Sequence, residues 1–314
     1  MLGFALTIQS CEKKAENLEK VILFNEQLSK LASESKNELF STHLKSIQHV
    51  LEGEKEISPD EAELIEHMYD TFLNDSLANP SDFESYLSRE RTLIIAWTSP
   101  TDDEVSFAWL RLPKDWDSEK EYPLYVHLHG YWDVADQPIS YMSYTFIESP
   151  STTYAYEDGY WLSPWGRGNK WYQGISKTDV WEAIIETERL TKIDPTRKYL
   201  SGHSMGGFGT WKIAQESNNY WAAIGIHSGA LWYDELSYIE PEFANNLKDM
   251  PVYFVWGDKE DIGLIESNEK ALELLKEAGN LRLAVTTFDG GHDYNEADVE
   301  NMYVWMREFR QNNR

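Results

Sequence analysis

The chain has 314 residues, of which 41% are hydrophobic and 14% aromatic, so it is too apolar to be disordered and long enough for one large domain with an appendage or for two domains. Asp and Glu number 54 against 28 Lys and Arg, which gives a formal charge of −26. Such a surface repels polyanions, so the charge argues against a nucleic-acid partner and favours neutral substrates over anionic ones.

The single cysteine, Cys11, follows a short apolar run over residues 2–8. One cysteine forms no internal disulfide and no cysteine-rich zinc site. An apolar run that ends in small or polar residues before a cysteine resembles the end of a bacterial lipoprotein signal. We therefore expect residues 1–11 to be the remnant of such a signal, Cys11 to be lipidated and membrane-anchored, and the protein to act at a bacterial cell envelope or in secreted form. The alternative is a cytoplasmic protein with an incidental cysteine.

The segment over residues 12–80 differs in composition from the rest, because all 13 tryptophans lie at or after Trp97. Its apolar residues recur at helical spacing in three stretches. The third stretch begins at Ser58-Pro59-Asp60-Glu61, where Ser58 predicts an N-cap and Glu61 completes a capping box. We expect a helical appendage that serves packing or acts as a spacer.

From residue 90 to residue 314 the pattern alternates between strands and helices. Residues 92–98 and 105–112 predict a hairpin. Short apolar runs typical of buried parallel strands follow at 124–128, 160–162, 199–200, 221–226, 252–256 and 281–285, with helical patterns at 179–190, 205–215, 266–278 and 296–309. Strands that alternate with helices predict an α/β domain with a mostly parallel sheet covered on both faces.

The strongest motif is Gly202-His203-Ser204-Met205-Gly206, which lies between a predicted strand and a predicted helix. A serine on such a turn adopts a strained backbone, and glycine is favoured two residues before and after it because the backbones approach closely. The motif predicts a nucleophile elbow with Ser204 as the nucleophile. The same turn aims the N–H of Met205 at a developing oxyanion, and the N–H of Tyr131, after Gly130, is the expected second donor.

A serine hydroxyl needs a base, and we expect His292 because it lies in a loop between the last predicted strand and the last predicted helix. The acid that orients this base is expected in the loop after Trp256, which offers Asp258, Glu260 and Asp261. Asp258 follows the strand most closely and suits turn hydrogen bonds. Glu260 and Asp261 are near equals, with a slight preference for Asp261 because a shorter carboxylate is the commoner orienting group.

The motifs resemble those of α/β-hydrolase-fold serine esterases of the polyhydroxybutyrate-depolymerase-like and feruloyl or acetyl esterase-like kind, to which prolyl-oligopeptidase-like peptidases are related. The resemblance spans about residues 95–312 and implies nucleophile Ser204, base His292 and oxyanion donors Met205 and Tyr131. Related sequences usually carry Asp at the position of Glu260, so either glutamate serves here or Asp261 takes the role. The resemblance rests on Leu128-His129-Gly130, Pro164-Trp165-Gly166-Arg167-Gly168-Asn169, Trp171-Tyr172, the elbow and Gly291-His292-Asp293.

We therefore expect a serine carboxylesterase that forms an acyl-enzyme on Ser204 and needs no metal or organic cofactor. The expected substrate is an acylated carbohydrate or a small aryl or alkyl ester. Trp171 and Tyr172 are candidates for substrate contact, against the alternative that these rings pack internally. Two rival hypotheses remain, a serine peptidase of the prolyl-oligopeptidase-like group and a non-catalytic surface lipoprotein that binds glycans.

Overall fold

The computed structural model describes residues 21–54, 57–74, 91–147, 157–233, 236–237, 242–260 and 263–311. The expected lipoprotein segment with Cys11 and one candidate acid, Asp261, lie outside these ranges. Among the helices that can be described, none combines the length and the apolar character that crossing a bilayer requires.

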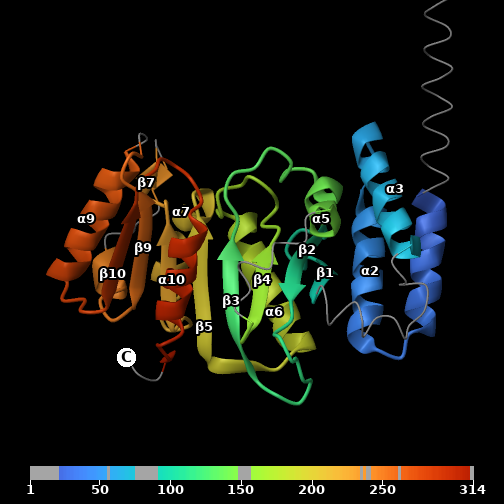
Figure 1. The fold of residues 1–314 in the computed structure, drawn as a ribbon, viewed down its shortest axis with the longest axis horizontal. Coiled ribbons are helices and arrows are strands. Elements are labelled where there is room, and N and C mark those ends of the chain that lie inside the picture. Colours follow the sequence, from blue (N-terminus) through green and yellow to red (C-terminus); the bar gives the residue numbers. More distant parts are fainter. Residues whose placement is uncertain are drawn as a thin grey trace, which may run out of the picture.

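An eight-stranded sheet in the order β1-β2-β4-β3-β5-β6-β9-β10 forms the centre of the structure (Figure 1). The pairs β1–β2 and β2–β4 are antiparallel, and the other pairs are parallel. The predicted mostly parallel sheet is therefore confirmed. The strands are β1 (Thr92–Thr98), β2 (Val105–Arg111), β3 (Tyr122–Leu128), β4 (Tyr160–Pro164), β5 (Ile193–His203), β6 (Ala223–His227), β9 (Val252–Gly257) and β10 (Leu283–Phe288).

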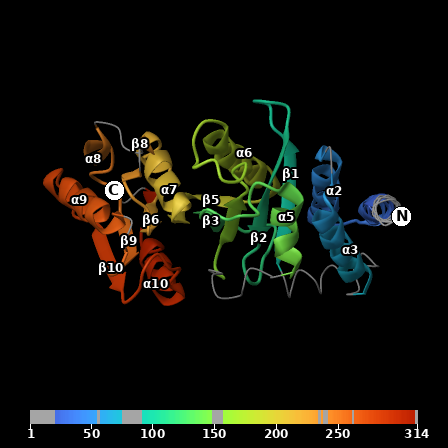
Figure 2. The same ribbon diagram turned by 90° about the horizontal axis from the view of Figure 1, so that it is seen from above.

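Helices cover both faces of this sheet, with α6 and α7 on one face and α10 on the other (Figure 2). Successive side chains of a strand point to opposite faces. On β3, Tyr125 accordingly packs in the cluster that contains Tyr303 of α10, whereas Leu124 and Val126 belong to the core that contains Trp211 of α7. The described helices after β1 are α5 (Pro138–Ile147), α6 (Ile175–Leu190), α7 (Met205–Glu216), α8 (Phe243–Asn246), α9 (Leu264–Glu277) and α10 (Glu296–Met306).

The structure differs from the sequence prediction at a few elements. Helix α5 was not predicted, and neither was the small antiparallel pair of β7 (Trp232–Tyr233) and β8 (Leu236–Ser237). The last strand begins at Leu283 rather than residue 281, because Asn280 forms a turn in which its side-chain oxygen accepts the N–H of Arg282. Leu281 consequently lies outside the sheet and is 95% exposed.

The described part of the N-terminal appendage consists of three helices, which lie beyond β1 (Figures 1 and 2). They are a helix over residues 21–34, α2 (Glu38–Gly53) and α3 (Pro59–Asn74). The predicted capping box is confirmed, because Glu61 accepts the N–H of Ser58 at 2.9 Å and Ser58 Oγ accepts the N–H of Glu61 at 3.2 Å. The helices bury Phe24, Leu28, Phe40, Leu44, Ile47, Ile65 and Met68.

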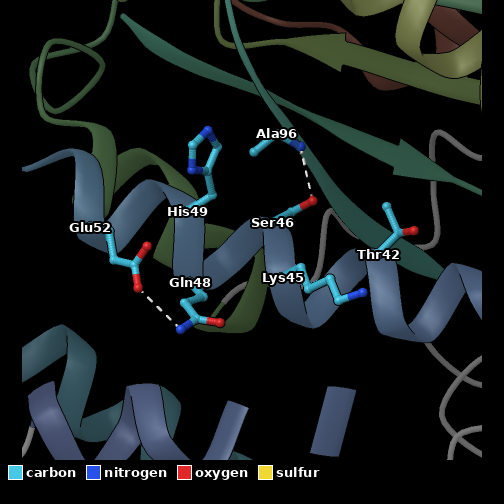
Figure 3. Close-up of a pocket in the computed structure, with 7 residues that line it drawn as sticks. All are labelled: Thr42, Lys45, Ser46, Gln48, His49, Glu52 and Ala96. Atoms are coloured by element: carbon cyan, nitrogen blue, oxygen red, sulfur yellow. Dashed lines mark hydrogen bonds between the residues drawn. The ribbon is translucent and has the colours of Figure 1, made fainter. Parts of the chain in front are cut away.

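Helix α2 covers the outer edge of the sheet. The N–H of Ile94 on β1 donates to Nδ1 of His43 at 2.8 Å, and the N–H of Ala96 donates to Oγ of Ser46 at 3.0 Å. Figure 3 shows the second of these bonds beside a surface pocket lined by α2. An uncovered edge strand presents unpaired N–H groups that can pair with another chain. The appendage therefore protects the sheet at the end opposite β10.

Candidate active site

Ser204 lies on a sharp turn between β5 and α7 with φ 53° and ψ −120°, a conformation that costs energy in a residue other than glycine. Two glycines make this turn possible. A Cβ on Gly202 would lie 2.3 Å from the carbonyl carbon of Gly206, and a Cβ on Gly206 would lie 1.9 Å from the carbonyl oxygen of Leu128. The backbone at Ser204 thus has the geometry of the predicted elbow.

The structure brings Ser204, His292 and Glu260 together. His292 lies in the loop between β10 and α10, and its Nε2 is 2.7 Å from Oγ of Ser204. Its other ring nitrogen, Nδ1, is 2.8 Å from Oε2 of Glu260. The arrangement can remove the serine proton and hold the imidazole in one orientation, which is the chemical requirement for an activated serine.

Backbone hydrogen bonds between two loops bring this carboxylate to the imidazole. In the loop after β9, Asp258 donates its N–H to the carbonyl of Phe288 at 2.9 Å, and Lys259 donates to that of Gly290 at 2.8 Å. Both acceptors lie just before His292. The next residue, Glu260, is consequently directed at the ring, with its side chain fully buried.

The other two candidate acids have different positions. Asp258 accepts the N–H of Gly290 at 3.3 Å, which is a bond between the two loops and not a hydrogen bond within its own turn. Asp261 lies outside the described residues. The slight preference for Asp261 is therefore not tested, and the carboxylate that contacts His292 among the described residues is that of Glu260.

Two backbone segments border the serine where an oxyanion would form. Met205 is the first residue of α7, so its N–H lies at the positive end of that helix. Gly130 lies on the other side, where a Cβ would be 3.5 Å from Cβ of Ser204. Tyr131 follows it with a side chain that is 59% exposed. Both expected donors thus come from segments next to the nucleophile.

The loop after β4 has an unusual backbone that is held by a buried carboxylate. Gly166, Arg167 and Gly168 have positive φ values of 61°, 58° and 77°. Asp179 of α6 accepts the N–H of Gly166 at 3.0 Å and Nε of Arg167 at 2.9 Å. Burial raises the pKa of Asp179 to about 6, although its bonds to Arg167 and to the N–H of Gly166 act in the opposite direction. The sequence analysis missed Asp179, because no local pattern distinguishes an anchoring aspartate on a helix.

Tyr172 does not line a cleft in this structure, contrary to its proposed role in substrate contact. Its side chain is fully buried, and its hydroxyl donates to the carbonyl of His129 at 3.2 Å. The ring fills the space beside Gly209 of α7, where a Cβ would lie 2.5 Å from it. Trp171 is half-buried, contacts Phe208 edge-on at 5.7 Å, and stays a candidate for substrate contact.

Further histidines pack behind His292. His203 stacks on it at 5.5 Å and contacts His227 at 4.5 Å. Burial lowers the pKa of His203 well below its ordinary value and that of His227 to about 3, so both rings are neutral. They support the base without adding charge. Within the described ranges, no group of three or more His, Cys, Asp or Glu side chains could hold a metal ion.

Strand order, elbow and the Ser204–His292–Glu260 arrangement together define the α/β-hydrolase fold with the site geometry of a serine hydrolase. The chain belongs to the family described as "Putative esterase", whose model matches residues 101–313, and this places it among the hydrolases.

Solved structures and curated proteins are similar to the chain. A thermostable esterase matches with a TM-score of 0.56 and 20% identity over 71% of this chain and 64% of its own. A ferulic acid esterase matches with a TM-score of 0.53 and 17% identity over 69% of this chain and 97% of its own. Dipeptidyl-peptidase 5 from Porphyromonas gingivalis is 27% identical over 48% of this chain, and the match spans only 23% of that longer protein.

Proposed function

We propose that the protein is a serine carboxylesterase in which Ser204 is the nucleophile, His292 the general base and Glu260 the orienting acid. The observation that carries the proposal is the continuous hydrogen-bonded chain from Ser204 Oγ to His292 Nε2 at 2.7 Å and from His292 Nδ1 to Glu260 Oε2 at 2.8 Å. Membership of the esterase family supports an ester as the substrate.

The reaction begins when His292 takes the proton of Ser204 as Oγ attacks the ester carbonyl carbon. The carbonyl oxygen becomes an oxyanion, which accepts hydrogen bonds from the N–H groups of Met205 and Tyr131. The tetrahedral intermediate collapses, and His292 gives its proton to the departing alcohol. Water then attacks the acyl-enzyme by the same steps and releases the acid. Glu260 keeps the imidazole in its orientation and stabilises the imidazolium.

We propose an acylated carbohydrate or a small aryl or alkyl ester as the substrate. The formal charge of −26 favours a neutral molecule, and the fold is shared with a ferulic acid esterase. Half-buried Trp171 is the candidate for contact with a sugar or phenolic ring. A location at the cell envelope, with Cys11 as a lipid anchor, remains a separate proposal that rests on the sequence around this cysteine.

The experiment compares wild type with Ser204→Ala on p-nitrophenyl acetate, a feruloyl ester and a dipeptide anilide. Ser204→Ala should lower kcat by about 10⁴-fold or more and abolish labelling by a fluorophosphonate probe. The exposed Ser118 provides a matched control, and Ser118→Ala should retain full activity.

Three outcomes would contradict the proposal. Equal labelling of wild type and Ser204→Ala would remove Ser204 as the nucleophile. A wild-type protein without labelling or turnover would favour the non-catalytic glycan-binding protein. Faster cleavage of the anilide than of the esters would favour a peptidase, the function named for the relative from P. gingivalis.

A further inference from the structure

Two segments that are distant in sequence contact each other beside the nucleophile. One is the 129–136 segment, which contains Tyr131, and the other is the loop over residues 165–169. The indole N–H of Trp165 donates to the carbonyl of Ala135 at 2.7 Å, and Nε2 of His129 lies 2.9 Å from the carbonyl oxygen of Trp165. The loop over residues 165–169 therefore holds the 129–136 segment in place.

Asn169 makes the most specific of these contacts. Its Oδ1 accepts the backbone N–H of Trp132 at 3.0 Å, and its Nδ2 donates to the backbone carbonyl of the same residue at 2.8 Å. The oxygen and the nitrogen of a primary amide lie at a fixed separation, so one side chain accepts and donates at the same time. An ionised carboxylate only accepts, and a hydroxyl uses one oxygen atom for both roles. The side chain thereby holds both polar groups of one residue.

That residue directly follows the proposed oxyanion donor. The N–H of Tyr131 shares its peptide plane with the carbonyl of Gly130, and the two groups point in opposite directions. The oxygen of Gly130 lies 2.7 Å from Nδ1 of His129. Burial lowers the pKa of His129 and keeps the ring neutral, so it donates to only one of its two carbonyl neighbours, Gly130 or Trp165. The contact of Asn169 with Trp132 holds the backbone that directly follows the donor.

Asn169 is itself held in place. Its backbone N–H donates to Oδ1 of Asp136 at 2.8 Å, and its Nδ2 lies 3.3 Å from Oδ2 of the same carboxylate. The preceding Arg167 has a φ of 58°, which costs energy in a residue other than glycine and persists only in a well-supported loop. The rigid loop fixes the amide of Asn169 before any substrate binds, which is the condition for a preorganised donor.

We propose that Asn169 is a positioning residue that holds the Gly130–Trp132 backbone in the orientation in which the N–H of Tyr131 faces the oxyanion. The inference rests on the proposed function, since it assigns Asn169 a part in the same reaction. Asn169 contacts neither the nucleophile nor the substrate and acts only through Trp132.

The test measures kcat and KM of Asn169→Asp and Asn169→Ala on an ester and on its thionoester. Sulfur accepts hydrogen bonds poorly, so a working oxyanion site prefers the ester strongly. The aspartate variant keeps the acceptor for the N–H of Trp132 but sets an oxygen against the carbonyl of Trp132 and against Asp136. Urea unfolding of each variant measures its stability separately.

A matched control exists far from the serine. The amide of Asn280 donates to the carbonyls of Leu247 and Met250, each at 2.8 Å, and accepts the N–H of Arg282 at 2.8 Å. Asn280→Asp therefore removes a comparable amide contact with backbone. It should lower the midpoint of unfolding and leave kcat and the ester preference as in wild type.

Both Asn169 variants should lower kcat by about 10- to 100-fold, change KM little and reduce the ester preference in the same proportion. Retention of kcat within threefold, or an unchanged ester preference despite lower kcat, would overturn the inference. Loss of the proposed function has a different signature, because wild type would then be inactive or Ser204→Ala active, whatever the Asn169 variants do.

Discussion

His43 of α2 accepts the backbone N–H of Ile94 on the edge strand at 2.8 Å, and burial lowers the pKa of this imidazole from 6.5 to about 4. The native contact needs Nδ1 without a proton, so the bond joins the appendage to the sheet only while His43 is neutral. His43 lies outside the active site, and its protonation makes the attachment of the N-terminal helices depend on pH.

The expected result is a loss of stability in acid. Between pH 6.5 and about 4 the unfolded chain binds a proton at His43 and the native protein does not, so stability falls as the pH falls. The full shift corresponds to about 3 kcal/mol of stability, which is present above pH 6.5 and lost below about pH 4.

Urea unfolding from pH 4 to pH 8 measures the slope of the unfolding free energy against pH. His43→Asn keeps an acceptor but does not titrate, so it should flatten the slope, whereas His49→Asn on the same helix should not. Equal slopes for wild type and His43→Asn would refute this prediction.

A second prediction concerns the acid. Glu260→Gln should lower kcat by about 10⁴-fold, because an amide neither stabilises the imidazolium nor favours the correct tautomer. Glu260→Asp withdraws the carboxylate by one methylene from its 2.8 Å contact and should lose part of the activity. The controls Asp258→Asn and Asp261→Asn should keep most of it. If Asp261→Asn lost as much activity as Glu260→Gln, Glu260 would not be the sole acid. If Glu260→Gln and Asp261→Asn both kept wild-type activity, the acid would be Asp258.

A third prediction tests the close approach of backbones at the elbow. In Gly206→Ala the new Cβ would lie 1.9 Å from the carbonyl oxygen of Leu128, which cannot move without displacing β3. We expect a loss of more than about 3 kcal/mol of stability. Gly279 has φ 89° but open space around it, so Gly279→Ala should cost only about 1 to 2 kcal/mol from backbone strain. Thermal unfolding compares the two, and equal effects would argue against the packing explanation.

A fourth prediction concerns a buried carboxylate that joins the first hairpin to α6. Glu182 accepts the indole N–H of Trp97 at 2.8 Å and the hydroxyls of Ser99 and Thr101, each at 3.0 Å. Glu182→Ala leaves these donors without their acceptor and should cost about 2 to 4 kcal/mol. Glu269→Ala on the exposed side of α9 should change stability by less than about 0.5 kcal/mol. The midpoint of urea unfolding measures both, and a similar small effect for Glu182→Ala would show that water replaces the lost acceptor.

The sequence by itself determined the features that depend on neighbouring residues. The capping box at Ser58 and Glu61 is a local exchange of hydrogen bonds, and glycine at position 202 avoids a clash with the backbone of Gly206 within the same turn. The alternation of strands and helices follows from periodic burial. Helix α5 was missed because apolar residues such as Ile139, Tyr141 and Met142 leave it without a polar face in the sequence pattern.

Only the tertiary structure decided which groups meet across the fold. Three carboxylates lie within four residues after β9, and backbone bonds from Asp258 and Lys259 to the β10 loop direct Glu260 at His292. Tyr172, a candidate for substrate contact, is buried because its ring fills the space over Gly209. Neither result is encoded in a local pattern, since each depends on the distance and direction between segments that pair or pack only after the chain has folded.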